Sequence, residues 1–517
     1  MNKIRAYSGI VYHAQYFPDT TAVTDDIGSY SYRELLDDAL RTVSAFRQAG
    51  LMASDRVAMA SDNRYEAIVL ILSGLLGGPV IVPVNRRMSA AEMMWVITHS
   101  QAKILVCDSE AMSALTAVEG HGLQEIQCMT FEGGGTGLKS ENKPFLSWLR
   151  TFTAADFDHH YQASRPYLQV YTSGTSGKPK GVVLTEENCL GQLSSLLMCL
   201  DVSLARGDSF YEGLPLFHVG GIMVTLLALS RGLALRFLGS FNPSAVLDMI
   251  CTKQVVHVAL VPAMIQACQN GDRNTAALQQ LQTIMYGASP ITETLLRNAK
   301  TRYQCDFFQI YGMTETHSVI TVLGSSDHEQ LFANKILAGT AGKPVPGAHL
   351  QIVDDQGVPL TPGQPGEIRV SCQHTMSGYW QNEAATNETV QEGYLYTGDV
   401  GFINDHGFLY IMDRKKDLII SGGENVSSLE VESALMAHPD INDVAVIGLP
   451  DERWGEMVTA VVVRSSDSVS EQDILAFSKN ALAGFKTPKR IIFSDVIPRN
   501  ANGKILKKNL RETYQKD

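Results

Sequence analysis

Hydrophobic residues in the first third of the chain follow two alternating spacings. Stretches with apolar residues three and four positions apart predict amphipathic or buried helices, and short β-branched runs between them predict strands. Helix and strand in regular alternation are typical of a parallel sheet covered by helices. The predicted elements are a helix over residues 32–48, a strand over 56–60, a helix over 64–76, a strand over 80–84, a helix over 90–100 and a strand over 103–107.

The same alternation resumes after residue 185 and gives way, near residue 338, to short strands rich in glycine and proline. The later part of the chain favours an antiparallel or barrel-like piece. The elements predicted here are helices over 187–199 and 221–230, and strands over 209–212, 234–237, 256–261, 283–286, 349–353 and 366–370.

The pattern therefore predicts an α/β fold with two helix-covered sheets, a distorted β-barrel subdomain and a small, mobile α+β C-terminal domain. The charged segment at residues 413–417 lies between two apolar runs and is the candidate boundary. We expect domains over residues 1–413 and 414–517, since 517 residues exceed what one core holds.

Composition narrows the class of protein. A net charge of −12 argues against general nucleic-acid or membrane-surface binding, although the tail from Phe485 to Asp517 is basic. The most apolar stretch, residues 67–84, is broken by glycines and a proline, so no membrane span is expected. The eight cysteines form no CxxC pattern and no signal peptide precedes the first helix, which predicts a cytoplasmic protein.

Residues 171–181, YTSGTSGKPKG, carry the strongest chemical signal. Glycine backbone N–H groups, hydroxyls and lysines together suit a polyphosphate. This is not a Walker A loop, because Thr172 and Pro179 stand where that motif needs glycine and Ser or Thr. Strand-like flanks on both sides predict a strand–loop–strand hairpin. A flexible linker is the alternative. The candidate phosphate ligands are Thr172, Ser173, Gly174, Thr175, Ser176, Gly177, Lys178 and Lys180.

Six further segments follow this loop in fixed order. They are YGASP at 286–290, YGMTE at 311–315, YTGD at 396–399, DRKKD at 413–417, SGGEN at 421–425 and PRNANGK at 498–504. Together with the loop, this set resembles the adenylate-forming superfamily of acyl-CoA synthetases, carrier-protein adenylation domains and luciferases, over essentially the whole chain.

The resemblance implies two half-reactions. A carboxylic acid attacks the α-phosphate of ATP to give acyl-AMP and pyrophosphate, and a thiol, usually of CoA, then displaces AMP. It implies that Glu315 holds Mg²⁺, that Tyr311 stacks on the adenine, and that Asp399 and Arg414 bind the ribose. The other residues that it assigns to ATP or AMP are Gly287, Ala288, Ser289, Gln309, Gly312 and Thr314.

Lys504 is the residue expected to carry the chemistry, by bridging the acyl carboxylate and the α-phosphate. A solvated lysine is the alternative. Because Lys504 must leave the site for thiol attack, the C-terminal domain is expected to rotate about Lys416. The rotation would bring a glycine-rich segment to the CoA channel, formed by Ser421, Gly422, Gly423 and Glu424.

The resemblance places the acyl pocket at residues 214–221, with His218 near the substrate carboxylate. A structural histidine is the alternative reading of His218. His317 departs from the small residues that often follow this motif, and either faces the acid or lies behind it. The residues assigned to the pocket are His218, Val219, Gly220, Gly221 and His317.

The resemblance predicts the class of reaction, but several acids and two kinds of thiol acceptor fit that class. We expect a fatty, aryl or related acid to be joined to CoA; the alternative acceptor is the phosphopantetheine of an acyl carrier protein. A luciferase-like oxygenase has no specific support, and a non-catalytic regulator would be expected to lack Lys504 or Glu315. A homodimer is one of the assemblies that the sequence allows.

Overall fold

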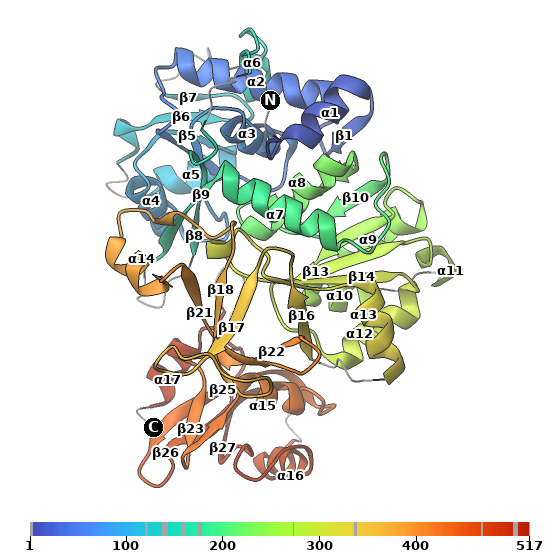
Figure 1. The fold of residues 1–517 in the computed structure, drawn as a ribbon, viewed down its shortest axis with the longest axis vertical. Coiled ribbons are helices and arrows are strands. Elements are labelled where there is room, and N and C mark those ends of the chain that lie inside the picture. Colours follow the sequence, from blue (N-terminus) through green and yellow to red (C-terminus); the bar gives the residue numbers. More distant parts are fainter. Residues whose placement is uncertain are drawn as a thin grey trace. The chain divides into compact units, whose positions relative to one another are not determined.

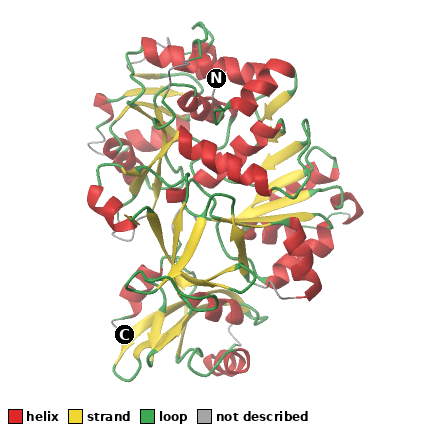
Figure 2. Ribbon diagram, in the orientation of Figure 1, coloured by secondary structure: helices red, strands yellow, loops and turns green. Residues whose placement is uncertain are grey.

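The computed structural model describes residues 4–118, 122–136, 143–157, 162–172, 178–271, 273, 275–334, 339–466, 469–499 and 505–515. These residues form two compact units, each described here by itself. The first contains residues Met1–His349 and Val370–Leu395, and the second contains Leu350–Arg369 and Tyr396–Asp517. Figures 1 and 2 show the mixed α/β character that the sequence predicts.

The first unit holds an eight-stranded, mostly parallel sheet with the strand order β19-β9-β8-β4-β3-β5-β6-β7. Alternate residues of its strands face opposite layers: Val57 and Ile81 pack into one core, whereas Ala58 and Val82 pack into another. The strands are β3 (Arg56–Ala60), β4 (Val80–Pro83), β5 (Ala102–Cys107), β6 (Gln127–Thr130), β7 (Gly135–Thr136), β8 (Pro166–Thr172), β9 (Lys180–Thr185) and β19 (Gly378–Tyr379).

Helices cover both faces of this sheet. Residues of α2 (Tyr32–Gln48) and α3 (Tyr65–Leu75) belong to the first core, and residues of α4 (Ala90–His99) and α5 (Ser109–Thr116) belong to the second. Helix α2 begins where the sequence predicts because Ser31 and Glu34 form a capping box, in which each side chain bonds the other's backbone N–H. A short helix, α6 (Phe145–Leu149), packs beside α2.

Helix α3 and strand β4 account for the most apolar stretch of the chain. Every residue of α3 is buried, and so is every residue of β4. The stretch is therefore interior helix and strand, and no helix in the described ranges is long and apolar enough to cross a bilayer.

A second sheet in the first unit runs in the order β16-β15-β14-β13-β12-β10-β11-β1-β2. Neighbours from β14 to β1 pair in parallel, and the strands at both ends pair antiparallel. The strands are β1 (Thr21–Thr24), β2 (Ser29–Ser31), β10 (Ser209–Glu212), β11 (Ala234–Arg236), β12 (His257–Leu260), β13 (Thr283–Gly287), β14 (Asp306–Tyr311), β15 (Thr321–Leu323) and β16 (Thr340–Pro344).

The first unit also contains further helices, one short strand and two 3₁₀ turns. They are α1 (Ser8–Tyr16), α7 (Glu186–Cys199), α8 (Val219–Arg231), α9 (Pro243–Cys251), α10 (Pro262–Gln269), α11 (Thr275–Leu278), α12 (Glu293–Tyr303), α13 (Ser325–Asn334), α14 (Glu383–Thr389) and β20 (Val390–Gln391), with single 3₁₀ turns η1 (Leu123–Glu125) and η2 (Thr314–Thr316).

The second unit combines a strand ladder with a small α+β layer pair. Strands β17 (His349–Val353), β18 (Gly366–Ser371), β21 (Tyr394–Ile403) and β22 (Leu409–Arg414), most of whose residues belong to this unit, neighbour one another in that order. The described strands close no barrel. The α+β part contains β23 (Ile419–Ser421), β24 (Glu424–Val426), β25 (Ile441–Asp451), β26 (Gly455–Arg464), β27 (Arg490–Phe493), α15 (Ser428–Leu435), α16 (Glu471–Ala481) and α17 (Lys507–Tyr514).

The five-stranded sheet of this α+β part has helices on both faces. Val446 and Val462 pack with residues of α15 and α16, whereas Ile447 and Val461 pack with Leu510 of α17. The large N-terminal and small C-terminal α/β parts that the sequence predicts are thus present. The boundary at residue 413 stays a prediction, because the compact units divide the ladder differently.

Candidate active site

The predicted strand–loop–strand hairpin is present. Strands β8 and β9 pair antiparallel, and Thr172 faces Lys180 across the ladder where the hairpin opens. The Lys178 ammonium lies 5.9 Å from the centre of the Trp95 ring. Thr172, Lys178 and Lys180 therefore stand at the two ends of the loop. The loop residues predicted to bind phosphate, Ser173, Gly174, Thr175, Ser176 and Gly177, lie outside the described residues.

Tyr379 links this hairpin to the predicted metal ligand. Its hydroxyl donates to Oε1 of Glu315 over 2.8 Å, and the Lys180 ammonium lies 4.7 Å from the centre of its ring. Burial and then the charge of Glu315 raise the pKa of Tyr379, so the phenol keeps the proton that it donates. Glu315 is itself buried in η2, next to Thr314. Lys180, Tyr379 and Glu315 thus form one polar cluster in the first unit.

Sequence reasoning did not single out Tyr379. Strand β19, which contains it, is only two residues long and pairs with Val182 and Val183 of β9, far away in sequence. The available signal was weak: Gly378, Tyr379 and Trp380 form an apolar triplet in a polar stretch just before the N-cap residue of α14, Asn382.

The segments YGASP and YGMTE leave the ends of adjacent parallel strands, β13 and β14. Gly287 and Gly312 are required for their close approach: a Cβ on Gly287 would meet the carbonyl oxygen of Ile310, and one on Gly312 would meet that of Ser318. Ala288 follows in a left-handed conformation with φ of 67° and is exposed, as is Ser289. Tyr311 is half-buried at the end of β14.

Gln309, also predicted to contact the nucleotide, is two residues before Tyr311. Its Oε1 accepts a hydrogen bond from the hydroxyl of Tyr286 over 3.0 Å, and that hydroxyl also lies 2.9 Å from Nε2 of His328. Gln309 on β14 and Tyr286 on β13 are therefore joined by a hydrogen bond, and Tyr286 extends this polar contact to the buried His328.

His317 is fully buried. Its Nε2 lies 2.8 Å from the hydroxyl of Tyr167 on β8, and the two rings stack with centroids 6.0 Å apart. Burial lowers the pKa of His317 to about 3, so the imidazole is neutral. The residue has φ of 52°, and the next residue, Ser318, has φ of 104°. His317 thus joins the η2 turn to the first sheet, and contact with an acid stays a prediction.

The predicted acyl segment joins β10 to α8. His218 is half-buried at the N-cap of α8, with its ring 4.8 Å from that of Phe217. Gly221, in the first turn of α8, packs against the segment itself: a Cβ there would meet the carbonyl oxygens of Pro215 and Leu214, the latter at 2.9 Å. Next to it, Gly220 has room for a Cβ, with Ser318 Oγ nearest at 4.0 Å.

In the second unit, Asp399 and Arg414 meet across the β21–β22 ladder. They are register partners, and Nε of Arg414 lies 2.7 Å from Oδ1 of Asp399. Asp399 is buried, while the Arg414 side chain is 37% exposed. Arg414 therefore holds the Asp399 carboxylate in place, and the two residues are predicted to bind the same ribose.

Lys416 and the predicted CoA-channel residues follow on the chain. Lys416 is exposed in the turn between β22 and β23. Gly422 and Gly423, with φ of 63° and 85°, are the turn residues of the hairpin that joins β23 to β24, where Ser421 pairs with Glu424. A two-residue turn with both φ positive explains the glycine pair locally. Lys504 lies outside the described residues.

Comparison with known proteins identifies the family. The model of the AMP-binding enzyme family matches residues 11–380, and the model of the AMP-binding enzyme C-terminal domain matches residues 430–504. The chain belongs to the AMP-binding enzyme family. The predicted recognition as an adenylate-forming enzyme is confirmed.

Relatives cover almost the whole chain. A fatty acid–[acyl-carrier-protein] ligase of Streptomyces coeruleorubidus is 32% identical over 98% of this chain and 96% of its own length. A 2-succinylbenzoate–CoA ligase of Bacillus cereus is 31% identical over 96% of each.

A solved structure agrees with these relatives. The o-succinylbenzoate–CoA synthetase of Bacillus subtilis with ATP and magnesium ion matches with a TM-score of 0.82 at 28% identity, over 98% of this chain and 99% of that one. This chain therefore has the fold that the sequence predicts. It also belongs to the predicted enzyme class, the acid–thiol ligases.

Proposed function

We propose that this enzyme activates a carboxylic acid with ATP and transfers the acyl group to the thiol of CoA. A carboxylate oxygen attacks the α-phosphorus of ATP, pyrophosphate leaves, and the thiolate then displaces AMP from the acyl carbon. The observation that supports this most is the polar cluster in which Lys180 of the phosphate hairpin and the carboxylate of Glu315 both contact Tyr379. Membership of the family gives the order of the two half-reactions.

We assign the triphosphate to the hairpin and to the turn after β14. Thr172, Lys178 and Lys180 would bind phosphate oxygens together with the loop residues between them, and Thr314 would add a hydroxyl. Tyr311, with the Gly287–Ser289 backbone and Gln309, would hold the adenine. Asp399 accepts hydrogen bonds from the ribose in this assignment, because its contact with Arg414 fixes the carboxylate.

Glu315 fits Mg²⁺. Its buried carboxylate offers oxygen, which is the donor that this hard cation prefers, and Mg²⁺ takes its other ligands from phosphate and water. Because Mg²⁺ usually takes only one or two protein carboxylates, Glu315 alone is enough for this assignment. Bound Mg²⁺ would neutralise phosphate charge. Tyr379, which donates to Oε1, would orient the Glu315 carboxylate toward it.

Lys504 is assigned to the adenylation step, where its ammonium neutralises the charge shared by the acyl carboxylate and the α-phosphate. The domains proposed for the two steps are residues 1–413 and 414–517, with Lys416 as hinge. The hairpin of Ser421, Gly422, Gly423 and Glu424, in which Ser421 is buried and the other three are exposed, would then face the pantetheine arm. The acid is assigned to the segment of His218, Val219, Gly220 and Gly221, with His317 behind the η2 turn.

Product analysis tests the function. The purified protein is incubated with Mg-ATP and a mixture of fatty, aryl and dicarboxylic acids, with and without CoA, and products are identified by mass spectrometry. The proposal predicts AMP and an acyl-CoA only when acid, ATP and CoA are all present. The absence of AMP and acyl-CoA with every acid would contradict it.

A carrier protein is the second candidate acceptor, and the fatty acid–[acyl-carrier-protein] ligase among the relatives favours it specifically. Both acceptors end in the same phosphopantetheine thiol, so the adenylation residues would be unchanged. Acyl-AMP that accumulates whether or not CoA is present, and disappears on addition of a phosphopantetheinylated acyl carrier protein, would select this candidate.

A further inference from the structure

Side chains bind the backbone of Leu214 and Leu216 in the segment that leads from β10 to His218. The N–H of Leu214 donates to Oε1 of Glu212 over 2.7 Å. Nδ2 of Asn63 donates to the carbonyl oxygen of Leu214 over 2.9 Å, and Oδ1 of Asn63 accepts from the N–H of Leu216 over 2.8 Å. The side-chain amide of Asn63 thus bonds the backbone on either side of Pro215.

Asn63 comes from the other sheet of the first unit. It lies in the loop between β3 and α3, whereas Leu214 and Leu216 follow β10. An amide side chain has one acceptor and one donor end, and here both are used on the same segment. Asn63 therefore joins the loops at the ends of two strands that belong to different sheets.

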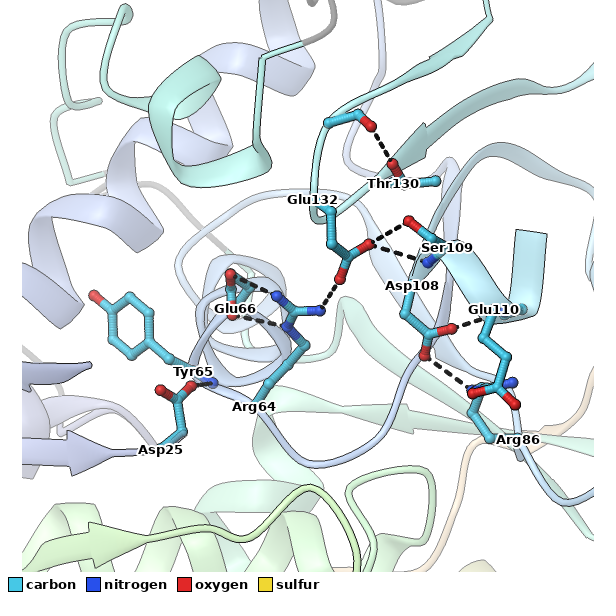
Figure 3. Close-up of polar contacts among 12 residues, drawn as sticks. Asp25, Arg64, Tyr65, Glu66, Arg86, Asp108, Ser109, Glu110, Thr130 and Glu132 are labelled. Atoms are coloured by element: carbon cyan, nitrogen blue, oxygen red, sulfur yellow. Dashed lines mark hydrogen bonds and ion pairs between the residues drawn. The ribbon is translucent and has the colours of Figure 1, made fainter. Parts of the chain in front are cut away.

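The loop that carries Asn63 is itself anchored, by the ion network in Figure 3. The guanidinium of Arg64 bonds both oxygens of Glu66, at 2.9 and 3.0 Å, and Oε1 of Glu132, at 2.7 Å. The second oxygen of Glu132 accepts from the backbone N–H and the hydroxyl of Ser109. Arg64 is mostly buried, with a side-chain exposure of 13%, and its guanidinium lies over the ring of Phe131.

A second anchor lies on the other side of Arg64. The N–H of Tyr65 donates to Oδ2 of Asp25 over 2.9 Å (Figure 3). The Tyr65 hydroxyl donates to Oδ2 of Asp38 over 3.0 Å. Because the two residues that follow Asn63 are fixed in this way, the amide of Asn63 presents its two ends from a rigid loop.

We propose that Asn63 is a positioning residue for acid binding, which holds the backbone of residues 214–216 so that His218 and the start of α8 form one fixed wall of the acyl pocket. This inference rests on the proposed function, since that function assigns the acid to this segment. It predicts that loss of the amide weakens binding of the acid and leaves binding of ATP unchanged.

The variant Asn63→Ala tests this. Pyrophosphate release is measured with 2-succinylbenzoate and with octanoate as probes. Losing two hydrogen bonds that order the segment is expected to raise the KM for the acid at least about fivefold, while the KM for ATP stays within about twofold. Asn63→Asp keeps the shape and the acceptor for Leu216 but puts a carboxylate oxygen in place of the donor to Leu214, and it replaces the alanine variant if that variant fails to fold.

Asn404→Ala is the matched control. Oδ1 of Asn404 also accepts from two backbone N–H groups, those of His406 and Phe408, but in a turn of the second unit. It should change neither KM. An unchanged KM for the acid in folded Asn63→Ala, or an equal rise in the KM for ATP, would overturn the inference.

Hydrogen exchange separates this inference from the proposed function. Amide exchange of a peptide covering residues 213–218 should accelerate in Asn63→Ala and stay unchanged in Asn404→Ala. If the wild-type protein releases no pyrophosphate with either probe, the assignment of function is in question, while exchange still decides whether Asn63 holds the segment. Unchanged exchange in Asn63→Ala would refute the positioning role by itself.

Discussion

The carboxyl group of Glu212 is buried in a place that cannot solvate a charge. One oxygen accepts the N–H of Leu214, and the other has no hydrogen-bond partner among the described residues. Burial raises the pKa of Glu212 well above its usual value of 4.5. A protonated carboxyl still accepts through its carbonyl oxygen, so the contact with Leu214 needs no charge.

The pH dependence of stability follows from this residue. Above about pH 4.5 the unfolded chain releases the proton that folded Glu212 keeps, so folding takes up a proton and the free energy of unfolding falls as pH rises. Glu212→Gln removes this loss. We expect its stability advantage over wild type to grow by up to about 1.4 kcal/mol per pH unit between pH 5 and the folded pKa.

Urea unfolding of the wild type and of Glu212→Gln at pH 5, 6, 7 and 8 measures the advantage. The exposed Glu452 provides the control, and Glu452→Gln should track the wild type at every pH. A Glu212→Gln curve parallel to that of the wild type would mean that Glu212 is ionised in the folded protein.

The proposed role of Lys504 predicts that the two half-reactions respond differently to one substitution. In Lys504→Ala, adenylation should fall by about two orders of magnitude or more, because the charge on the reacting oxygens loses its partner. Thioesterification of synthetic acyl-AMP should largely survive. Pyrophosphate exchange and acyl-CoA formation from acyl-AMP measure the two steps.

Lys508 is the control for Lys504, since it lies in the same basic tail and its side chain is 67% exposed. Lys508→Ala is expected to leave both rates unchanged. Equal loss of the two half-reactions in Lys504→Ala would argue against a lysine that serves adenylation alone.

At the scale of elements, the close packing of the acyl segment against α8 requires a glycine at position 221. A Cβ on Gly221 would meet the carbonyl oxygens of Pro215 and Leu214, which are backbone atoms and cannot rotate away. Gly221→Ala should therefore destabilise the protein by about 1–3 kcal/mol, as overpacking does. Gly220→Ala, one position earlier and in open space, should be neutral or add up to about 1 kcal/mol from helix propensity.

Thermal unfolding of the two glycine variants side by side gives the comparison. A similar midpoint for Gly221→Ala and Gly220→Ala would show that α8 and the segment separate without cost.

Elements were predictable from the sequence wherever local signals and burial agree. The helix over Tyr32–Gln48 has its capping box, and the hairpin of β8 and β9 has glycine between two apolar runs. Strands β1 and β2 were not predicted, because they are short and rich in Ser and Thr. Strand β1 pairs with β2 and, through Val23 and Leu235, with the distant β11.

The candidate site divides in the same way. Motif residues such as Glu315 and Asp399 could be named as candidates from the sequence, because their segments resemble those of the adenylate-forming superfamily. Tyr379 and Asn63 could not, because each acts on a segment that is distant in sequence. A long-range hydrogen bond leaves no trace in the local pattern of either partner.

At the scale of the whole molecule, two compact units carry different parts of the proposed chemistry. The first contains the phosphate hairpin, Glu315 and the acyl segment; the second contains Asp399, Arg414 and the hinge candidate Lys416. Each unit has its own buried clusters, so a change in one is expected to leave the core of the other intact. Such a division of parts would suit an enzyme that catalyses two half-reactions.

The central claim is that an oxygen of the acid attacks the α-phosphorus of ATP, and isotope transfer tests it directly. The protein is incubated with Mg-ATP, CoA and mixed acids whose carboxylates carry ¹⁸O, and the AMP is analysed by mass spectrometry. The account predicts AMP that contains one ¹⁸O atom, because the thiol leaves that oxygen on phosphorus when it displaces AMP. Unlabelled AMP, or ADP with the label in inorganic phosphate, would contradict it.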